Sequence, residues 1–145
     1  MITPKGCIVV YVEPTPVFER KYMKVYIVPD DIHELIVPLP KKIYMNKDMI
    51  QPFENALIDI CNGGYADQIK EWGGCFCIRN MRGIRPPTKS IHSWGIAVDL
   101  NETIFPQRMK LSAAPDYIQC FIDNGLDWGN SFPTADPMHV KLSEI

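Results

Sequence analysis

Ser90-Ile91-His92-Ser93-Trp94-Gly95-Ile96-Ala97-Val98-Asp99-Leu100 is the most informative stretch of this sequence. Its second half, residues 96–100, alternates large apolar side chains with Ala97 and Asp99, which is the pattern of a half-buried strand. Residues 138–142 repeat the pattern, with His139 and Lys141 on the face opposite the apolar side chains. If the two strands pair, a carboxylate and an imidazole project from the same side of one sheet.

Helical periodicity is clearest after Asn46-Lys47-Asp48, and Cys61-Asn62-Gly63-Gly64 ends that helix. We expect a short second helix over residues 66–72, a strand over 75–79 after Gly73-Gly74, and a polar loop from 82 to 90. A third helix is predicted to start at Pro115 and to end at Asn124-Gly125. Its inner face is expected to carry Ile118, Phe121 and Ile122.

Residues 1–45 contain prolines at positions 14, 16, 29, 38 and 40, which argue against a long helix. We predict short strands at 7–12, 23–28 and 34–37, joined by irregular segments. The mixed order of elements indicates one α+β domain over residues 1–145, with a small antiparallel sheet and about three helices. Residues 1–22 form an N-terminal extension to which the sequence assigns no role.

Composition narrows the class of protein. The 145 residues are 46% hydrophobic and 22% charged, values typical of a globular chain. Fifteen Lys and Arg against 17 Asp and Glu give a net charge of -2, so nucleic acid is not an expected partner. We expect no transmembrane segment and no secretory signal, hence synthesis in the cytoplasm. A monomer is expected.

The five cysteines, Cys7, Cys61, Cys75, Cys77 and Cys120, cannot all pair, and we predict free thiols. In a strand, Cys75 and Cys77 would point to one face. No further ligands stand nearby at metal-binding spacing, so these cysteines are interpreted as structural.

His92, His139 and Asp99 together match a common catalytic zinc set, because three protein ligands leave a fourth position for water. Zinc can lower the pKa of water to about 7, and a nearby carboxylate must then accept the proton. Asp136, three residues before His139, can reach the same place across a turn. The spacing is equally compatible with two ordinary polar histidines at a sheet edge. His33, beside Asp30-Asp31, is interpreted as a surface residue.

The motif Ser90-x-His92-x-x-Gly95-x-Ala97-x-Asp99, followed about forty residues later by Asp136-x-x-His139, resembles the VanY-like D-alanyl-D-alanine carboxypeptidase and L-alanyl-D-glutamate endopeptidase family of zinc peptidases. Gly73-Gly74-Cys75-Phe76 with Arg79 and Arg82-Gly83 is similar to the family's segment before the first histidine. Gly125-Leu126-Asp127-Trp128-Gly129 is similar to its Gly-x-x-Trp-Gly stretch. The resemblance covers roughly residues 23–145.

This resemblance implies a hedgehog/DD-peptidase-like fold, zinc held by His92, Asp99 and His139, and Asp136 as general base. It implies an arginine that contacts substrate, Arg79 or otherwise Arg82, with Ser90 bracing the site or touching substrate. Gly95 is expected to let backbone pass close to the metal. Val140 replaces the family's usual aromatic residue, which predicts an altered cleft wall.

The implied substrate is the peptidoglycan stem peptide, cut by a phage-type lytic enzyme that reaches the cell wall after release. The expected mechanism is zinc-assisted peptide hydrolysis. The competing class is a non-catalytic binding module that keeps zinc for stability.

Overall fold

The computed structural model describes residues 2–145, which form an α+β fold, as predicted. It has five α-helices where about three were expected: α1 (Pro4–Tyr11), α2 (Pro16–Tyr22), α3 (Asp30–Leu35), α4 (Lys47–Gly63) and α5 (Asp116–Asp123). The strands are β1 (Met23–Ile27), β2 (Lys42–Asn46), β3 (Trp72–Gly74), β4 (Ala97–Leu100), β5 (Leu126–Trp128) and β6 (His139–Leu142). Three 3-10 turns complete the described elements: η1 (Ala66–Gln68), η2 (Ile91–Trp94) and η3 (Gly129–Ser131).

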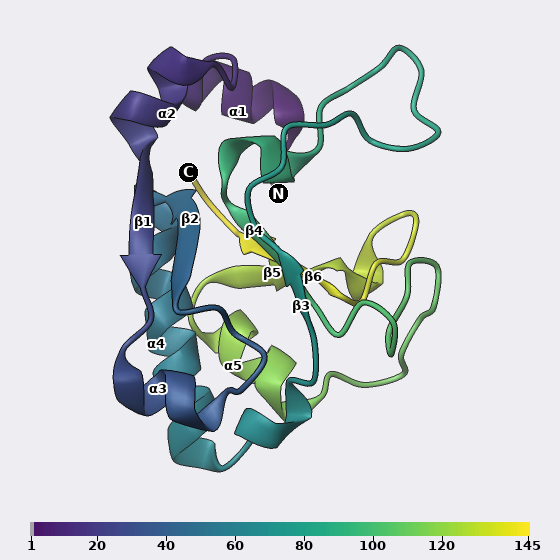
Figure 1. Cartoon of the computed structure of the whole chain (residues 1–145). Coiled ribbons are helices and arrows are strands. Elements are labelled where there is room, and N and C mark those ends of the chain that lie inside the picture. The colour runs from purple at the N-terminus through teal and green to yellow at the C-terminus, as the bar shows by residue number, and fades with distance from the viewer. Residues whose placement is uncertain (1) are drawn as a thin grey trace.

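A four-stranded antiparallel sheet, in the order β3-β4-β6-β5, lies at the centre of the molecule (Figure 1). The hairpin of β1 and β2 forms a separate two-stranded sheet beside α4. The two strands predicted from alternation are confirmed as β4 and β6, and they pair with Asp99 opposite His139. Directly opposed residues share a face of a sheet, so this register brings the carboxylate and the imidazole together.

Helix α4 shows why the longest predicted helix forms. The Asn46 side chain accepts a hydrogen bond from the Asp48 amide at its start, and Gly64 ends it with a left-handed φ of 79°. Its buried face packs on α5, where the Phe53 and Phe121 rings stack at 5.9 Å. Burying a side chain of this size contributes roughly 1.5–3 kcal/mol. Helix α5 also matches its prediction, except that Ile122 is exposed, since it lies about 100° around the helix from Phe121.

The predicted strand at 7–12 is wrong, because these residues lie mainly in α1. Pro4 occupies the first turn of α1, where a missing amide costs nothing, and the Thr3 hydroxyl caps the Gly6 amide. Cys7 and Tyr11, one helical turn apart, form the buried face. Pro16 likewise occupies the first turn of α2, although Thr15 makes no side-chain cap there, so both prolines start helices instead of breaking them.

Two other predictions for the first half need correction, while the predicted strand at 23–28 is confirmed as β1. Residues 34–37 are not a strand but the end of α3 and the turn after it. Only η1 is helical within 66–72, and β3 begins at Trp72. The chain after β3, residues 75–79, leaves the sheet. As a result Cys75 is buried and Cys77 exposed, contrary to the expectation of one shared face, and all five cysteines are free.

The N-terminal extension packs into the same core as the rest of the chain. The Trp94 indole donates to the Val12 carbonyl at 2.9 Å, and the Lys141 ammonium donates to the Ile2 carbonyl at 2.8 Å. Tyr11 packs edge-on against Phe18. Residues 2–22 therefore cover η2 and the end of β6. Among residues 2–145, none of the helices has the length and apolar character needed to span a membrane.

Candidate metal centre

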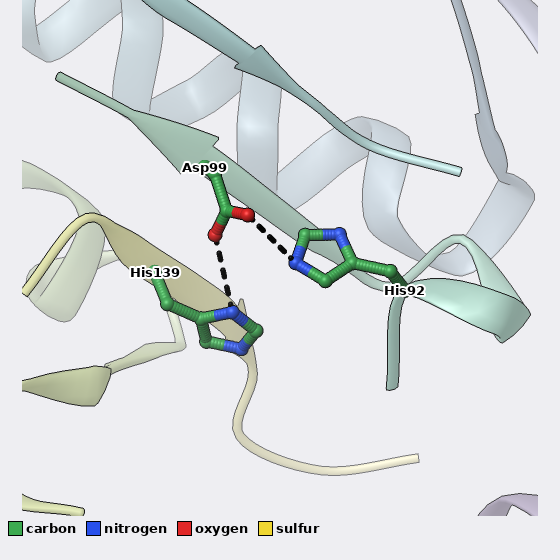
Figure 2. A group of neighbouring side chains, drawn as sticks. All are labelled: His92, Asp99 and His139. Atoms are coloured by element: carbon green, nitrogen blue, oxygen red, sulfur yellow. Dashed lines mark ion pairs between the residues drawn. The ribbon is translucent and has the colours of Figure 1, made fainter. Parts of the chain in front are cut away.

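Three side chains suited to binding a metal converge on β4, β6 and the turn before β4 (Figure 2). His92 comes from η2, Asp99 from β4 and His139 from β6, and one ligand atom of each lies within 4.8 Å of the others. His33 lies on α3 and is not part of this group. The structure therefore brings together the three residues that sequence patterns singled out.

The Asp99 carboxylate lies between the two imidazoles. Its Oδ2 is 3.1 Å from His92 Nε2, and its Oδ1 is 3.3 Å from His139 Nδ1. The two rings meet edge to face with their centroids 5.0 Å apart. The His92 and His139 side chains are only 5% and 8% exposed and that of Asp99 16%, so the cluster is largely shielded from water.

His92 is held in one orientation by the backbone that precedes it. Its Nδ1 lies 2.7 Å from the Cys75 carbonyl oxygen, which can only accept, so Nδ1 carries the proton. In the neutral ring the lone pair is therefore on Nε2, the nitrogen that lies 3.1 Å from Asp99 Oδ2. The Ser90 hydroxyl accepts from the His92 amide and caps η2. Metal-binding histidines commonly fix their second ring nitrogen on a backbone carbonyl in this way.

The end of β2 supports the same turn. Gly95 has a φ of 67°, and a Cβ there would lie 2.9 Å from the Asn46 amide nitrogen and 2.7 Å from Met23 Sδ. Asn46 donates its amide to the Gly95 carbonyl and its side chain to the Trp94 carbonyl, each at 3.0 Å. Gly95 is thus needed for close contact with Met23 and Asn46, and its expected role in letting backbone pass close to a metal stays a prediction.

Charges within the cluster shift its pKa values in opposite directions. Burial raises the pKa of the Asp99 carboxyl, but the adjacent His139 and His92 outweigh burial and hold that pKa below its ordinary value. Burial lowers the pKa of His92, and the Asp99 carboxylate more than offsets it, so the pKa of His92 is raised. Asp99 is consequently ionised at neutral pH.

Three buried atoms here lack a hydrogen-bond partner within the described residues: His92 Nε2, Asp99 Oδ1 and Asp136 Oδ1. The short contacts of Asp99 with the two imidazoles are ion pairs only where the ring is protonated. Leaving buried polar atoms unpaired is costly, and a cation among them would satisfy their lone pairs. Two imidazole nitrogens and one carboxylate oxygen are a donor set that suits Zn²⁺.

Asp136 lies beside this group on the segment before β6. Its Oδ2 is 3.9 Å from His139 Nδ1, and burial raises the pKa of its carboxyl above the ordinary value. Its amide donates to the Gly129 carbonyl at 2.9 Å, while a Cβ on Gly129 would lie only 2.3 Å from the Asp136 carbonyl oxygen. Trp128 donates its indole N–H to the Pro137 carbonyl at 2.7 Å. The Trp128-Gly129 pair thus holds the loop that presents Asp136.

The structure treats the two candidate arginines differently. The Arg79 backbone is tied to η2, because its amide donates to the buried Ser93 hydroxyl at 3.2 Å and its carbonyl accepts from the Ser90 amide at 2.8 Å. The positive charge of Arg79 acts to lower the pKa values of both His92 and Asp136. Arg82 is three residues further along an exposed loop.

Sequence reasoning did not identify Phe132, the aromatic residue beside this site, and it wrongly assigned Val140 to the wall of a cleft. Val140 is completely buried in the core, on the face opposite His139, and does not form a cleft wall. Phe132 packs instead against the His139 ring at a centroid distance of 5.5 Å. Phe132 follows η3 in an irregular segment, where no periodicity could have indicated it. Ser93 and Asn46 were also missed.

Residues 85–142 match the sequence model of a protein family described as D-alanyl-D-alanine carboxypeptidase. The matched range includes His92, Asp99, Asp136 and His139, and it supports the resemblance to this class of peptidase. It covers less than half of the chain and leaves out α1 to β3. No curated protein and no solved structure was found to match the chain.

Proposed function

We propose that this protein is a zinc-dependent metallopeptidase that hydrolyses peptidoglycan stem peptides. The bond cut is that of a D-Ala-D-Ala carboxypeptidase or of an L-Ala-D-Glu endopeptidase. The observation that carries the proposal is the convergence of His92, Asp99 and His139 with an additional, partly buried carboxylate, Asp136, at their side. The family match over the same residues supports it. The phage-type setting stays a prediction.

In this proposal His92 Nε2, a carboxylate oxygen of Asp99 and His139 Nδ1 hold the zinc ion. When bound, zinc supplies a Lewis acid that activates water and polarises the peptide carbonyl. The chain keeps its ligands in place beforehand: Cys75 fixes the His92 ring, and β4 and β6 fix the other two. This arrangement reduces the reorganisation needed on binding.

Asp136 is the proton carrier. It takes a proton from the attacking water and returns one to the nitrogen of the leaving amine, so the net reaction consumes one water per peptide bond. Burial raises the pKa of Asp136 above its ordinary value, which favours a group that must both accept and donate a proton. We assign to Arg79 the role of binding the oxygen that becomes negative during attack, because its backbone is joined by hydrogen bonds to the turn that carries His92. Ser90 caps the His92 turn and braces the site.

A non-catalytic zinc module of the same fold is the competing function. A zinc site used only for stability requires ligands but no unpaired carboxylate beside them. One carboxylate oxygen of Asp136 is buried without a hydrogen-bond partner, which destabilises the fold. A catalytic role would explain why a residue with this cost in stability is present. This observation favours the enzyme.

The deciding experiment combines metal analysis with digestion of purified peptidoglycan and identification of the new termini by mass spectrometry. Asp136→Asn is expected to keep one zinc per chain and to lower hydrolysis by on the order of a hundredfold or more. Asp99→Asn serves as the contrast, because an amide is a poor zinc ligand and the metal itself should be lost. A zinc-loaded wild type that binds wall fragments without cleaving them would establish the binding module instead.

A further inference from the structure

The loop between β3 and η2 has a charge opposite to that of the chain as a whole. Residues 72–98 contain four basic side chains, Arg79, Arg82, Arg85 and Lys89, and no Asp or Glu. The rest of the chain contains all 17 acidic residues and the other 11 Lys and Arg residues, so it is acidic. Such a segregated charge is a physical feature that favours partners of the opposite sign.

This loop is anchored at its base and free at its tip. Met81 donates its amide to the Thr88 carbonyl at 2.7 Å, and Asn80 pairs with Lys89 across the loop. Figure 1 shows the loop projecting away from the sheet, on the side opposite β1 and α2. Arg79, Arg82 and Arg85 are exposed. The guanidinium groups of the loop are therefore accessible to solvent.

The charges on the loop are not neutralised within the protein. Across residues 2–145 the ion pairs are that of Lys41 with Asp30 and those of the histidine cluster, and none involves a loop cation. Like charges on one short loop repel one another, and no ion pair within residues 2–145 offsets that repulsion. Its first cation, Arg79, is joined by backbone hydrogen bonds to Ser90 and Ser93, which flank His92, so the basic row begins beside the candidate metal centre.

We infer that the loop of residues 79–89 binds carboxylates of an acidic peptide substrate on one side of the bond to be cut. This inference rests on the proposed function and names the class of substrate: a peptide with at least one carboxylate besides any at the scissile position. Guanidinium groups bind carboxylates through two parallel hydrogen bonds, which suits a loop with three arginines. A long polyanion fits less well, because the acidic remainder of the chain would repel it.

The test compares two synthetic stem peptides that differ only in whether the additional carboxylate is free or amidated. Wild type is expected to prefer the free acid by on the order of tenfold in kcat/KM, mainly through KM, and less so at high ionic strength. Arg82→Gln/Arg85→Gln is expected to lose most of this preference. The matched control, Arg20→Gln/Lys24→Gln, removes the same charge from α2 and β1 and should keep it.

The inference is overturned if the double variant keeps the preference of wild type, or if it loses activity equally on both peptides. It is also overturned if a poly(glycerol phosphate) chain binds more tightly than the acidic peptide and loses that affinity in the variant. Calorimetric binding of the two peptides to zinc-loaded Asp136→Asn repeats the comparison without catalysis. Absence of cleavage by wild type would contradict the proposed function alone, since the binding preference can still be measured.

Discussion

Asn46 determines how firmly the turn that carries His92 is held, and its replacement has a calculable cost. The side chain is completely buried, accepts from the Asp48 amide at the start of α4, and donates to the Trp94 carbonyl in η2. Asn46→Ala removes both contacts. Loss of the helix cap costs about 1 kcal/mol, and the buried Trp94 carbonyl left without a partner costs about 1–3 kcal/mol. The free energy of unfolding should therefore fall by about 2–4 kcal/mol.

Asn46→Ser separates the two contributions. Its hydroxyl can still cap α4, but it has no amide group to reach the Trp94 carbonyl. Its loss of stability should be smaller than that of Asn46→Ala by about 1 kcal/mol, the usual value of a cap. Because both variants release the turn before β4, each should also bind zinc about 10- to 100-fold more weakly, as is typical when the groups that orient a ligand are removed.

Urea unfolding of the metal-free protein measures the free energy of unfolding of each variant. Competition with a zinc chelator measures its zinc affinity. A change below about 0.5 kcal/mol in Asn46→Ala would refute the assigned contacts, since that is the range of a neutral surface substitution. Reduced stability with unaltered zinc affinity would refute the narrower claim that Asn46 positions His92.

Three further outcomes are expected. Replacing His92 or His139 with alanine should prevent the binding of one zinc per chain, as measured by metal analysis after gel filtration. His33→Ala on α3 should still bind zinc, and equal loss of zinc in all three variants would mean that the site lies elsewhere. Gly129→Ala should lower the free energy of unfolding in urea by about 1–3 kcal/mol, because the alanine Cβ would lie 2.3 Å from the Asp136 carbonyl oxygen. A variant as stable as the wild type would contradict that contact. In native thiol titration Cys77, the exposed cysteine, should react first, and slow reaction at Cys77 would contradict the position of its loop.

Elements with a strong local pattern were predictable from the sequence. Alternation located β4 and β6 to within a residue, and helical spacing with an Asn cap and a terminal Gly located α4. Strand periodicity also showed that Asp99 and His139 point to the face opposite their apolar neighbours. These signals are local, because a half-buried element must separate its apolar and polar side chains whatever it packs against.

Other features depended on contacts that the sequence does not display. The apolar run at 7–12 suits a strand as well as a helix, and only the Thr3-Pro4 start and the buried pair Cys7 and Tyr11 decide for α1. Val140 could equally have lined a cleft until β6 was seen with that face in the core. Gly95 is required by the close approach of Asn46 and Met23, which no pattern near residue 95 reveals.

The sequence by itself determined which side chains could serve as ligands and on which face of their strands they lie. Only the tertiary structure decided what surrounds them, because the supporting contacts join distant parts of the chain. Asn46 reaches Trp94 across 48 residues, Val12 meets the same tryptophan across 82, and Ile2 meets Lys141 across 139. Periodicity records that a face is buried, whereas the identity of its partner is set when the whole chain packs.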